Sequence, residues 1–278
     1  MCVPFVPHPD PEVARGPTSV KRERFSGEPA SVAKMDSLVG RKILRFDAVE
    51  STNDTAKELL GGDADEGTVI VAERQVAGKG RHGRAWFSPP GGLYCSVVLK
   101  PDDKNVPMLN LISGMPVVKA LRHWSVLATL KWPNDVVFRN RKIGGVLCEG
   151  VYRHDAFWVV AGIGVNTNTP LDRLPTEVRG TATSLKAEAE IEVSNEEFLE
   201  YMLRDFDKVY KASQSSARNV LARDYMALCS TIRQRVAVET PQGTVRGTAI
   251  EVTTQGALVL VDIAGRRVEV EDGSVRPA

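Results

Sequence analysis

Glycines and basic side chains alternate in the twelve residues from Gln75 to Trp86. The glycines stand at positions 78, 80 and 83, and the basic residues among them are Lys79, Arg81, His82 and Arg84. Glycine leaves backbone amides accessible, and amides mixed with cations suit an anion such as phosphate. A large aromatic ring at the end of the segment is a platform for a flat group such as a nucleobase. This segment, called the glycine loop below, therefore predicts a nucleotide site.

Two other interpretations of the glycine loop were weighed. It is not a Walker phosphate loop, because His82 follows Arg81 where that motif needs a hydroxyl. A solvated basic surface loop is the second alternative, since runs of charge usually face solvent. Trp86 disfavours that alternative, because a large aromatic residue closing a polar loop suits a ligand that can stack on it.

Two further segments carry side chains that suit a polar or anionic ligand. Ser51, Thr52 and Asn53 stand at the start of a predicted helix, where capping side chains and free amides can also bind a ligand. Lys142 precedes an apolar strand with glycines at 144 and 145, which indicates close approach of a backbone or a ligand. A lone lysine at a turn is normally solvated, whereas this position makes it a candidate for a buried anion contact.

Hydrophobic patterning predicts the elements that position these residues. We expect strands at 43–46, 68–72, 92–99 and 157–166, a hairpin around 139–141, and helices within 50–60 and at 107–124, 194–212 and 217–228. A capping box at 194–197 opens the third helix. The glycine loop therefore connects two strands, which can hold it over a sheet. Short alternating strands from about Ile232 predict a small β-barrel.

The composition is that of an ordinary globular chain. It has 278 residues, 26% of them charged, and a formal net charge of +1, without the basic excess typical of nucleic-acid binders. The four cysteines form no C-x-x-C pair, which disfavours structural zinc and is typical of a reduced, cytoplasmic protein. The longest uncharged apolar stretch, 105–118, is too short to span a bilayer. Residues 1–38 are rich in proline without a hydrophobic period, so we expect them to be disordered.

A series of motifs in a fixed order makes the chain resemble the biotin protein ligases between about Arg41 and Arg276. The motifs are Ser-Thr-Asn at 51–53, the glycine loop, Lys-Trp-Pro-Asn-Asp at 131–135, Arg-Lys-Ile-Gly-Gly at 141–145, Gly-Ile-Gly-Val-Asn at 162–166, Thr-Ser-Leu at 183–185 and Gly-Ser-Val-Arg at 273–276. The resemblance implies an α/β (α+β) fold like that of class II aminoacyl-tRNA synthetases, with helices on one face of a mixed β-sheet. It divides the chain into a tail at 1–38, a catalytic domain at 39–231 and an SH3-like β-barrel at 232–278.

The resemblance also implies a reaction in two steps. Biotin and Mg-ATP give biotinyl-5′-AMP and pyrophosphate, and the adenylate then acylates one lysine of a biotin carboxyl carrier protein. The protein mainly supplies positioning and positive charge to such a reaction between anions. Mg²⁺ is implied as a cofactor whose protein ligands are left unassigned. The implied class is the monofunctional one, which binds neither DNA nor membrane, and a homodimer is compatible with it.

The matched motifs imply roles for individual residues. Arg81 and Lys142 match the catalytic residues: Lys142 meets the biotin carboxylate and the α-phosphate, and Arg81 holds the nascent acyl-phosphate. The implied biotin contacts are Ser51, Thr52, Asn53, Gln75, Lys79, Gly80, Arg81, Lys142, Gly145, Gly162 and Gly164, of which Ser51, Thr52, Asn53 and Gln75 hold the ureido end. The implied adenylate contacts are Arg81, Arg84, Trp86, Lys131, Asn134, Asp135, Lys142, Asn166 and Arg276. Trp86 is expected to stack on adenine with Asn134 and Asn166 at its polar edge, and Asp135 to orient a cation or the metal.

One position departs from the family pattern, and other classes of function stay open. The family loop usually reads Gly-Arg-Gly-Arg, whereas Lys79 here keeps the charge and loses the planar fork, which puts retention of the adenylate in question. A lipoate ligase or octanoyltransferase shares the fold, but the glycine loop with Lys-Trp-Pro-Asn-Asp favours biotin. A repressor would need a DNA-reading element, which residues 1–38 do not offer. A carrier-binding module would not need a loop so rich in cations.

Overall fold

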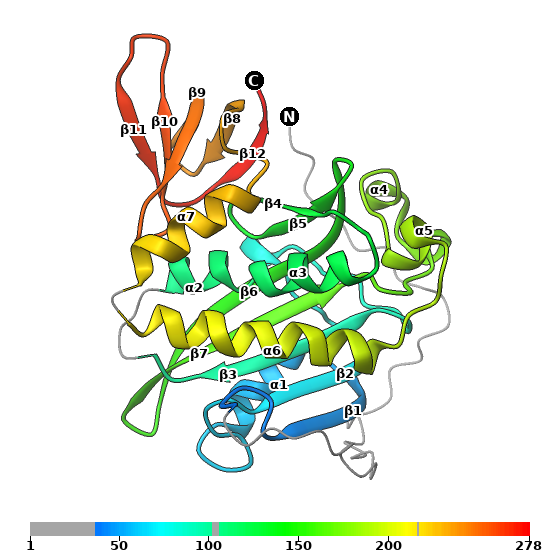
Figure 1. Ribbon diagram of the computed structural model, residues 1–278. Helices are drawn as coiled ribbons and strands as arrows, with labels where there is room; N and C mark the ends of the chain where they lie inside the picture. Colours follow the sequence, from blue (N-terminus) through cyan, green and yellow to red (C-terminus); the bar gives the residue numbers. More distant parts are fainter. Residues whose placement is uncertain (1–36, 102–105, 216) are drawn as a thin grey trace.

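The computed structural model describes residues 37–101, 106–215 and 217–278, and a mixed sheet of seven strands forms its centre (Figure 1). The strand order is β1-β2-β3-β7-β6-β5-β4. β1 and β2 are parallel, and the other neighbours are antiparallel. The strands are β1 (Ile43–Val49), β2 (Val69–Gln75), β3 (Leu93–Leu99), β4 (Thr129–Lys131), β5 (Asp135–Phe138), β6 (Arg141–Arg153) and β7 (Ala156–Val165). The predicted mixed sheet and its hairpin are confirmed.

The central strands are covered on both faces, which explains their nearly continuous apolar sequence. All seven residues of β3 are buried. Neighbouring residues of β7 point to opposite faces: Val159 and Ala161 belong to a large apolar core, and Trp158 and Val160 to a smaller one. The sheet therefore separates two hydrophobic cores of unequal size.

Helices lie on both faces of the sheet, which corrects part of the expected architecture. α2 (Val106–Ile112), α3 (Met115–His123), α6 (Asn195–Ser213) and α7 (Arg218–Leu228) lie in front of the sheet in Figure 1. α1 (Thr52–Leu59) packs behind it, against β2, β3 and β7. The prediction of helices on one face therefore holds for the large core only. On the other face, α1 covers the smaller core with its buried Ala56.

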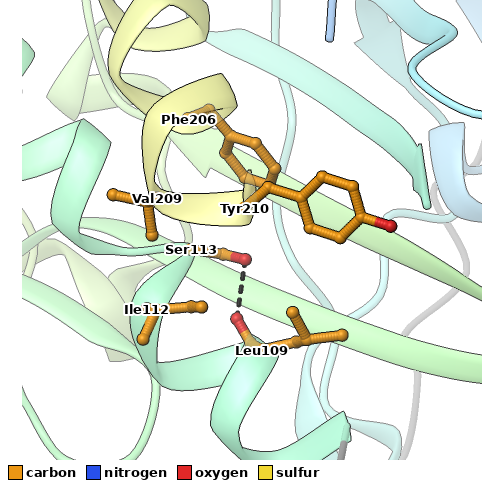
Figure 2. Close-up of a pocket in the computed structure, with 6 residues that line it drawn as sticks. All are labelled: Leu109, Ile112, Ser113, Phe206, Val209 and Tyr210. Atoms are coloured by element: carbon orange, nitrogen blue, oxygen red, sulfur yellow. Dashed lines mark hydrogen bonds between the residues drawn. The ribbon is translucent and has the colours of Figure 1, made fainter. Parts of the chain in front are cut away.

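The helix expected at 107–124 is divided into α2 and α3. Pro116 stands in the first turn of α3, where its missing amide costs nothing, whereas inside one long helix it would remove a hydrogen bond. Figure 2 shows how α2 packs against α6, with Ser113 Oγ donating to Leu109 O over 2.7 Å. The small pocket there is lined by Leu109, Ile112, Ser113, Phe206, Val209 and Tyr210. These are core residues, and the pocket lies apart from every predicted site residue.

The helices near the C-terminal end of the catalytic region match the sequence prediction closely. α6 begins after Ser194, whose Oγ accepts from Glu197 N over 3.3 Å as the capping box predicts. Its predicted apolar face is buried, including Phe198, Met202 and Phe206. Two short helices, α4 (Thr176–Arg179) and α5 (Leu185–Ala189), complete the edge of the domain beside β5 and β6.

A second, antiparallel sheet follows from Arg235, with the strand order β11-β10-β9-β8-β12. Its strands are β8 (Arg235–Thr240), β9 (Gly243–Val252), β10 (Leu258–Val261), β11 (Arg267–Val270) and β12 (Ser274–Pro277). The end strands β11 and β12 do not pair with each other in the described residues, so the predicted small β-unit is an open sheet rather than a closed barrel. Val236 and Leu258 join the large core, and Trp132 Nε1 donates to Gly256 O over 3.0 Å. The second sheet is thereby anchored beside the Lys-Trp-Pro-Asn-Asp segment.

Residues 1–36 of the predicted tail at 1–38 lie outside the described residues. Ser37 and Leu38 are described, and the amides of Leu38 and Val39 both donate to Asp207 Oδ1, over 2.9 and 3.0 Å. Leu38, the last residue of the predicted tail, is therefore attached to the folded domain. Among the described helices, none has the length and apolar character needed to cross a membrane.

Candidate active site

Two glycines on neighbouring strands form the floor on which Trp86 lies. Gly145 of β6 and Gly164 of β7 are paired in register. A Cβ on Gly164 would lie 2.5 Å from Trp86 Cε2 and Nε1, and a Cβ on Gly145 would lie 3.2 Å from Cζ3. Only glycine leaves the sheet surface low enough for the indole ring. The end of the glycine loop is thus brought onto the sheet, as predicted.

Lys142 and Asp135 stand beside this indole ring. Lys142 Nζ lies 5.1 Å from the centre of the Trp86 ring and 2.5 Å from Asp135 Oδ1. The Lys142 backbone is fixed on its other side, donating to Thr181 O over 2.7 Å and accepting from Thr183 N over 2.9 Å. A cation next to a flat ring is a suitable pair of contacts for a nucleotide phosphate and its base.

The indole nitrogen of Trp86 is a buried donor without an acceptor in the described part of the chain. A buried N–H that lacks a partner costs about 1–3 kcal/mol. This nitrogen lies against Gly164, where an added Cβ would be 2.5 Å from it. Trp86 therefore offers a bound molecule an apolar face, while its nitrogen is covered by the site floor.

The glycine loop is closed against the second sheet. Arg81 forms an ion pair with Asp272, and Arg84 Nη2 donates to Ser274 Oγ over 3.2 Å. Burial and the charge of Arg84 lower the pKa of Arg81, whereas Asp135 raises it. Arg81 therefore lies within electrostatic reach of the pair formed by Asp135 and Lys142, and it stays charged because a guanidinium does not deprotonate in proteins.

The loop has a defined internal structure around the short 3-10 turn Arg81–Gly83. Gly80 N donates to Arg84 O over 2.7 Å, and Trp86 N donates to Gly78 O over 2.8 Å. His82 inside the turn has φ of 56°, a left-handed conformation that is uncommon for a residue other than glycine. The backbone amides of the loop are thus arranged in a tight, strained turn above the sheet.

A second group of predicted residues meets under α1. Gln75 Oε1 accepts from Thr52 N over 2.8 Å, and Gln75 Nε2 donates to Ser88 Oγ over 2.8 Å. Ser96 Oγ lies 2.7 Å from Asn53 Oδ1. Gly162 makes room for this amide, since a Cβ there would lie 2.3 Å from Asn53 Oδ1. Thr52, Asn53 and Gln75 therefore form one polar cluster beside Gly162, and Ser51, the preceding residue of the chain, is buried as well.

Lys79 is directed toward α1 rather than toward Lys142. Its Nζ lies 2.6 Å from Asp54 Oδ2, and its side chain is about half exposed at 49%. The hydrogen bond to Asp54 raises the pKa of Lys79, against the lowering effect of burial. Lys79 thus ties the glycine loop to α1, which the sequence did not indicate.

Four further predicted residues occupy different surroundings. Asn134 Nδ2 donates to Val146 O over 2.7 Å, and Asn166 Nδ2 donates to Thr183 O over 3.0 Å, so both amides hold backbone near the site. Lys131 is half-buried on β4, in register with Asp135. Arg276 lies exposed on β12 with Glu239 Oε1 3.0 Å away. Arg276 thus belongs to the second sheet, and its partner Glu239 lies on β8 of the same sheet.

Sequence reasoning missed several residues that the structure adds to the site. Ser96, Ser88 and Glu149 bond to the polar cluster under α1, and Asp272 holds Arg81. Ser96 carried a signal, because it is a polar residue in the middle of a fully buried strand. Asp272 carried none, because its contact depends on how the second sheet docks on the first.

Together, the fold and the site residues are those of a class of nucleotide-dependent enzymes, and the comparisons with known proteins identify that class. A protein-family model, that of the "Biotin/lipoate A/B protein ligase family", matches residues 45–166 of this chain. The chain is 34% identical to the biotin–[acetyl-CoA-carboxylase] ligase of Mycobacterium tuberculosis, over 83% of this chain and 88% of the relative. It is 31% identical to the bifunctional ligase/repressor BirA of Bacillus spizizenii, over 80% and 70%.

Solved structures agree with these relatives. The biotin protein ligase of Aquifex aeolicus in complex with biotin and ATP has a TM-score of 0.75 and 28% identity, covering 86% of this chain and all 100% of that one. The apo structure of the same protein gives a TM-score of 0.71 at 24% identity, which shows the fold. The chain therefore belongs to the biotin/lipoate A/B protein ligase family, and the relatives it matches within that family are biotin protein ligases.

Proposed function

We propose that the chain activates biotin with ATP to biotinyl-5′-AMP and pyrophosphate, and then transfers biotin to one lysine of a biotin carboxyl carrier protein. The observation that carries the proposal is the position of Lys142, 5.1 Å from the centre of the Trp86 ring on the floor made by Gly145 and Gly164. A nucleotide whose base stacks on that ring has its phosphate within reach of the ammonium. Family relatives crystallised with biotin and ATP support the choice of substrates.

In the activation step, a biotin carboxylate oxygen attacks the α-phosphorus of ATP and the bond to pyrophosphate breaks. Both reactants are anions, so their repulsion must be offset by positive charge that is already in place. Lys142 is assigned to the carboxylate and the α-phosphate, and Arg81 to the oxygens of the acyl-phosphate that forms. Asp135 orients Lys142 through the 2.5 Å ion pair until these anions take its place.

The polar cluster under α1 is assigned to the ureido end of biotin. Thr52, Asn53 and Gln75 supply hydrogen-bonding groups there, and Ser51, the residue before Thr52, is buried as well. In the transfer step, the carrier's lysine amine attacks the acyl carbon, and AMP leaves with the electrons of the acyl–phosphate bond. The glycine loop must open for this lysine, and its attachments through Arg81 and Arg84 are weak enough to break.

Mg²⁺ enters the proposal as a companion of ATP. Among the residues that the structure describes, no group of three His, Cys, Asp or Glu side chains could hold a metal ion. Asp135, beside Lys142, is the carboxylate assigned to the ion. A single carboxylate fits Mg²⁺, which commonly binds through one or two carboxylates together with substrate phosphates and water. When bound, Mg²⁺ would neutralise charge on the phosphates.

The cellular setting follows from the substrates and the thiols. Cys95, Cys148 and Cys229 are free, and burial raises the pKa of the Cys95 and Cys148 thiols to about 12. Free, unreactive thiols are compatible with a cytoplasmic protein. A homodimer is a further expectation of the family resemblance, and light scattering of the purified chain tests it.

The test is ATP–pyrophosphate exchange with radiolabelled pyrophosphate, with biotin, lipoate or octanoate as the acid. We expect exchange with biotin and Mg-ATP, and transfer of label to an added biotin carboxyl carrier domain. Exchange supported by lipoate instead of biotin would assign the chain to the lipoate branch of the family. Exchange without any transfer to the carrier domain would leave the activation step and overturn the transfer step.

A further inference from the structure

A β-bulge at Lys142 decides which way its side chain points. Val136 of β5 pairs with Gly144 of β6, but the next residue, Val137, pairs with Lys142. Ile143 is therefore an additional residue in β6 with no partner on β5. A bulge of this kind redirects the side chains beside it and is common next to active sites. The direction of the Lys142 ammonium thus depends on what holds the bulge.

A short segment outside the two strands holds the backbone of the bulge. Lys142 N donates to Thr181 O over 2.7 Å, and Thr183 N donates to Lys142 O over 2.9 Å. Lys142 and Ala182 accordingly form an isolated parallel bridge. Even a whole isolated hairpin is only marginally stable in water, so a bridge of one residue needs further contacts to keep its place.

Glu188 of α5 supplies such contacts on both sides of the bridge. Its Oε1 accepts from Thr183 Oγ1 over 2.6 Å, and the same oxygen accepts from Nη2 of Arg141, the residue before Lys142. Its Oε2 lies 3.6 Å from Arg139 Nη1. The Glu188 side chain is only 4% exposed, and its charge is stable there because these groups pair with it. One buried carboxylate therefore joins the bulged strand to the segment that holds it.

The hairpin turn between β5 and β6 brings the two arginines to this carboxylate. Arg139 and Asn140 have φ of 49° and 61°, the left-handed values that a two-residue type I′ turn requires, and Phe138 pairs with Arg141 across it. Left-handed backbone is uncommon for arginine, so the turn needs an interaction that keeps Arg139 in place. The ion pair with Glu188 provides one, and the Phe138 ring, with its centre 4.9 Å from the guanidinium carbon of Arg139, provides another. The turn and α5 thus converge on Glu188.

We infer that Glu188 is a positioning residue: through Arg141 and Thr183 it fixes the bulge that directs Lys142 toward the biotin carboxylate and the α-phosphate. The inference rests on the proposed function, because it assigns a support to the cation of that reaction. Glu188 is assigned no contact with either substrate and acts only through these neighbours. A displacement of about 1 Å at a catalytic group can cost about a hundredfold in rate, so the support of the bulge has a measurable effect.

Two substitutions at Glu188 separate its hydrogen bonds from the bulk of its side chain. Glu188→Met keeps a side chain of similar length and removes the acceptor of both Arg141 and Thr183. Arg141 is 40% exposed, so its guanidinium can turn to water instead of staying unpaired in the interior. Glu188→Gln keeps one amide oxygen, whose two lone pairs can accept from Arg141 and Thr183 as Oε1 does. The amide NH₂ then faces Arg139, which is 74% exposed and can move away.

The experiment measures kcat and KM of biotin-dependent pyrophosphate exchange in the full chain, with the folding of each variant checked by circular dichroism. We expect Glu188→Met to lower kcat about tenfold, because Lys142 is no longer held at the reacting groups. KM for biotin and for ATP should change by less than about threefold, since the contacts assigned to the ureido ring and the adenine are undisturbed. Glu188→Gln should stay within about twofold of the wild-type kcat. Glu192→Met is the matched control and should leave kcat unchanged, because it removes a nearby 2.7 Å ion pair with Lys186 that does not touch the bulge.

A double-mutant cycle with Lys142→Ala distinguishes positioning from a general structural defect. Because Glu188 acts through the Lys142 ammonium, Glu188→Met should cause no further loss once that ammonium is absent. The same tenfold loss in the Lys142→Ala background would overturn the inference. A wild-type kcat in Glu188→Met, or a loss in Glu188→Gln as large as that in Glu188→Met, would also overturn it while wild-type exchange upholds the proposed function. Absence of biotin-dependent exchange in wild type would overturn the proposed function and, with it, the inference.

Thr183→Val takes the place of Glu188→Met if that variant does not fold. It keeps the backbone bonds between Thr183 and Lys142 and removes one of the two side-chain bonds to Glu188. We expect kcat to fall about threefold, because the bulge is then held through Arg141 alone. An unchanged kcat would again overturn the inference.

Discussion

Lys142 and Trp86 lie together although 55 residues separate them, with the Lys142 ammonium 5.1 Å from the centre of the indole ring. Lys142 comes from the start of β6, and Trp86 comes from the end of the glycine loop. The two glycines beneath the ring, at 145 and 164, are what allow this approach. A cation and a stacking surface are thereby presented to one ligand from two unrelated segments.

Replacing Lys142 by alanine tests its assigned role in activation. We expect pyrophosphate exchange to fall by about a thousandfold, because the change removes a charge directed at the reacting phosphate. The fold should be retained, since the Lys142 backbone bonds to Thr181 and Thr183 remain. Exchange and thermal melting of the purified variant are the measurements. A variant that exchanges at the wild-type rate would remove Lys142 from the mechanism.

Replacing Gly164 by alanine tests the floor under Trp86. The added Cβ would lie 2.5 Å from the indole, so the ring must shift. We expect KM for ATP to rise about tenfold, because overpacking costs about 1–3 kcal/mol and displaces the stacking surface. Gly180→Ala is the matched control, because a Cβ there meets nothing within 4 Å. Equal KM values for ATP in the two variants would show that Trp86 does not bind the nucleotide.

The sequence predicted the elements and the identity of the site better than it predicted the contacts within it. Patterns of apolar residues predicted the positions of the strands and of α6. The ordered motifs predicted that Trp86, Lys142 and Asp135 lie close together, as they do in the structure. The division of α2 from α3 was missed although Pro116 marked it, because the apolar pattern runs on through the break. Contacts such as Arg81 with Asp272 depend on the docking of two sheets, which no local pattern encodes.

The direction of Lys79 illustrates a second limit. Its place in a loop of the kind that binds phosphate predicted a ligand contact. The Lys79 ammonium instead lies 2.6 Å from Asp54 Oδ2. A lysine on a flexible stem can pair with a carboxylate within its reach, and Asp54 is brought there by α1. The sequence shows which residues of such a loop are charged, but the partner of each charge depends on the surrounding fold.

Asp207 tests the boundary of the folded domain through pH. Burial acts to raise the pKa of this carboxyl, but bonds from Lys211, Val39 and Leu38 outweigh it, so the pKa lies below its ordinary value of 3.8. A lowered pKa gives stability that is full above the unfolded-state value and is lost as pH falls through the folded one. We expect Asp207→Asn to lose about 2 kcal/mol at pH 7, the scale of hydrogen bonds to a charged group.

The difference between Asp207→Asn and wild type should begin to shrink below about pH 4, where the carboxyl of the unfolded chain takes up a proton, and should disappear as pH falls through the lower folded-state pKa. Urea unfolding at pH 7 and pH 3 measures it. Deleting residues 1–36 should leave stability unchanged, whereas deleting 1–39 removes the amides of Leu38 and Val39 and the buried Val39 side chain, and should cost more than Asp207→Asn. A gap that stays constant with pH would show that the charge of Asp207 contributes nothing.

The ion pair between Arg81 and Asp272 predicts how the glycine loop opens. Asp272→Asn weakens the attachment of the loop to the second sheet, so cleavage by trypsin at Arg81 and Arg84 should become faster in the free protein. Biotin with ATP should protect the loop in wild type and in the variant, because the bound phosphate then holds Arg81 instead. Cleavage rates followed by gel and mass spectrometry measure this. Equal rates with and without ligands in wild type would mean that the loop does not close over them.

Retention of the adenylate is the last property that Arg81 should control. Biotinyl-AMP is a mixed anhydride that reacts with any accessible lysine, so targeted labelling requires the enzyme to hold it until the carrier arrives. A guanidinium can hold a phosphate oxygen and the acyl oxygen together, and Arg81 sits on the loop that closes over them. We expect Arg81→Gly to keep making adenylate more slowly, release it early, and label bystander proteins.

The measurement compares biotin incorporated into an added inert protein with biotin incorporated into the carrier domain. Arg81→Gly should raise the bystander share several-fold, whereas Arg173→Gly, an exposed arginine on the turn Leu171–Arg173, should leave it unchanged. Lys79→Arg should alter the share little, because the charge that pairs with Asp54 is kept. If Arg81→Gly makes adenylate and labels the bystander no more than wild type does, another residue retains the intermediate. Arg84, held by Ser274 on the second sheet, is then the next to replace, because it is the other loop cation that can reach a phosphate when the loop moves.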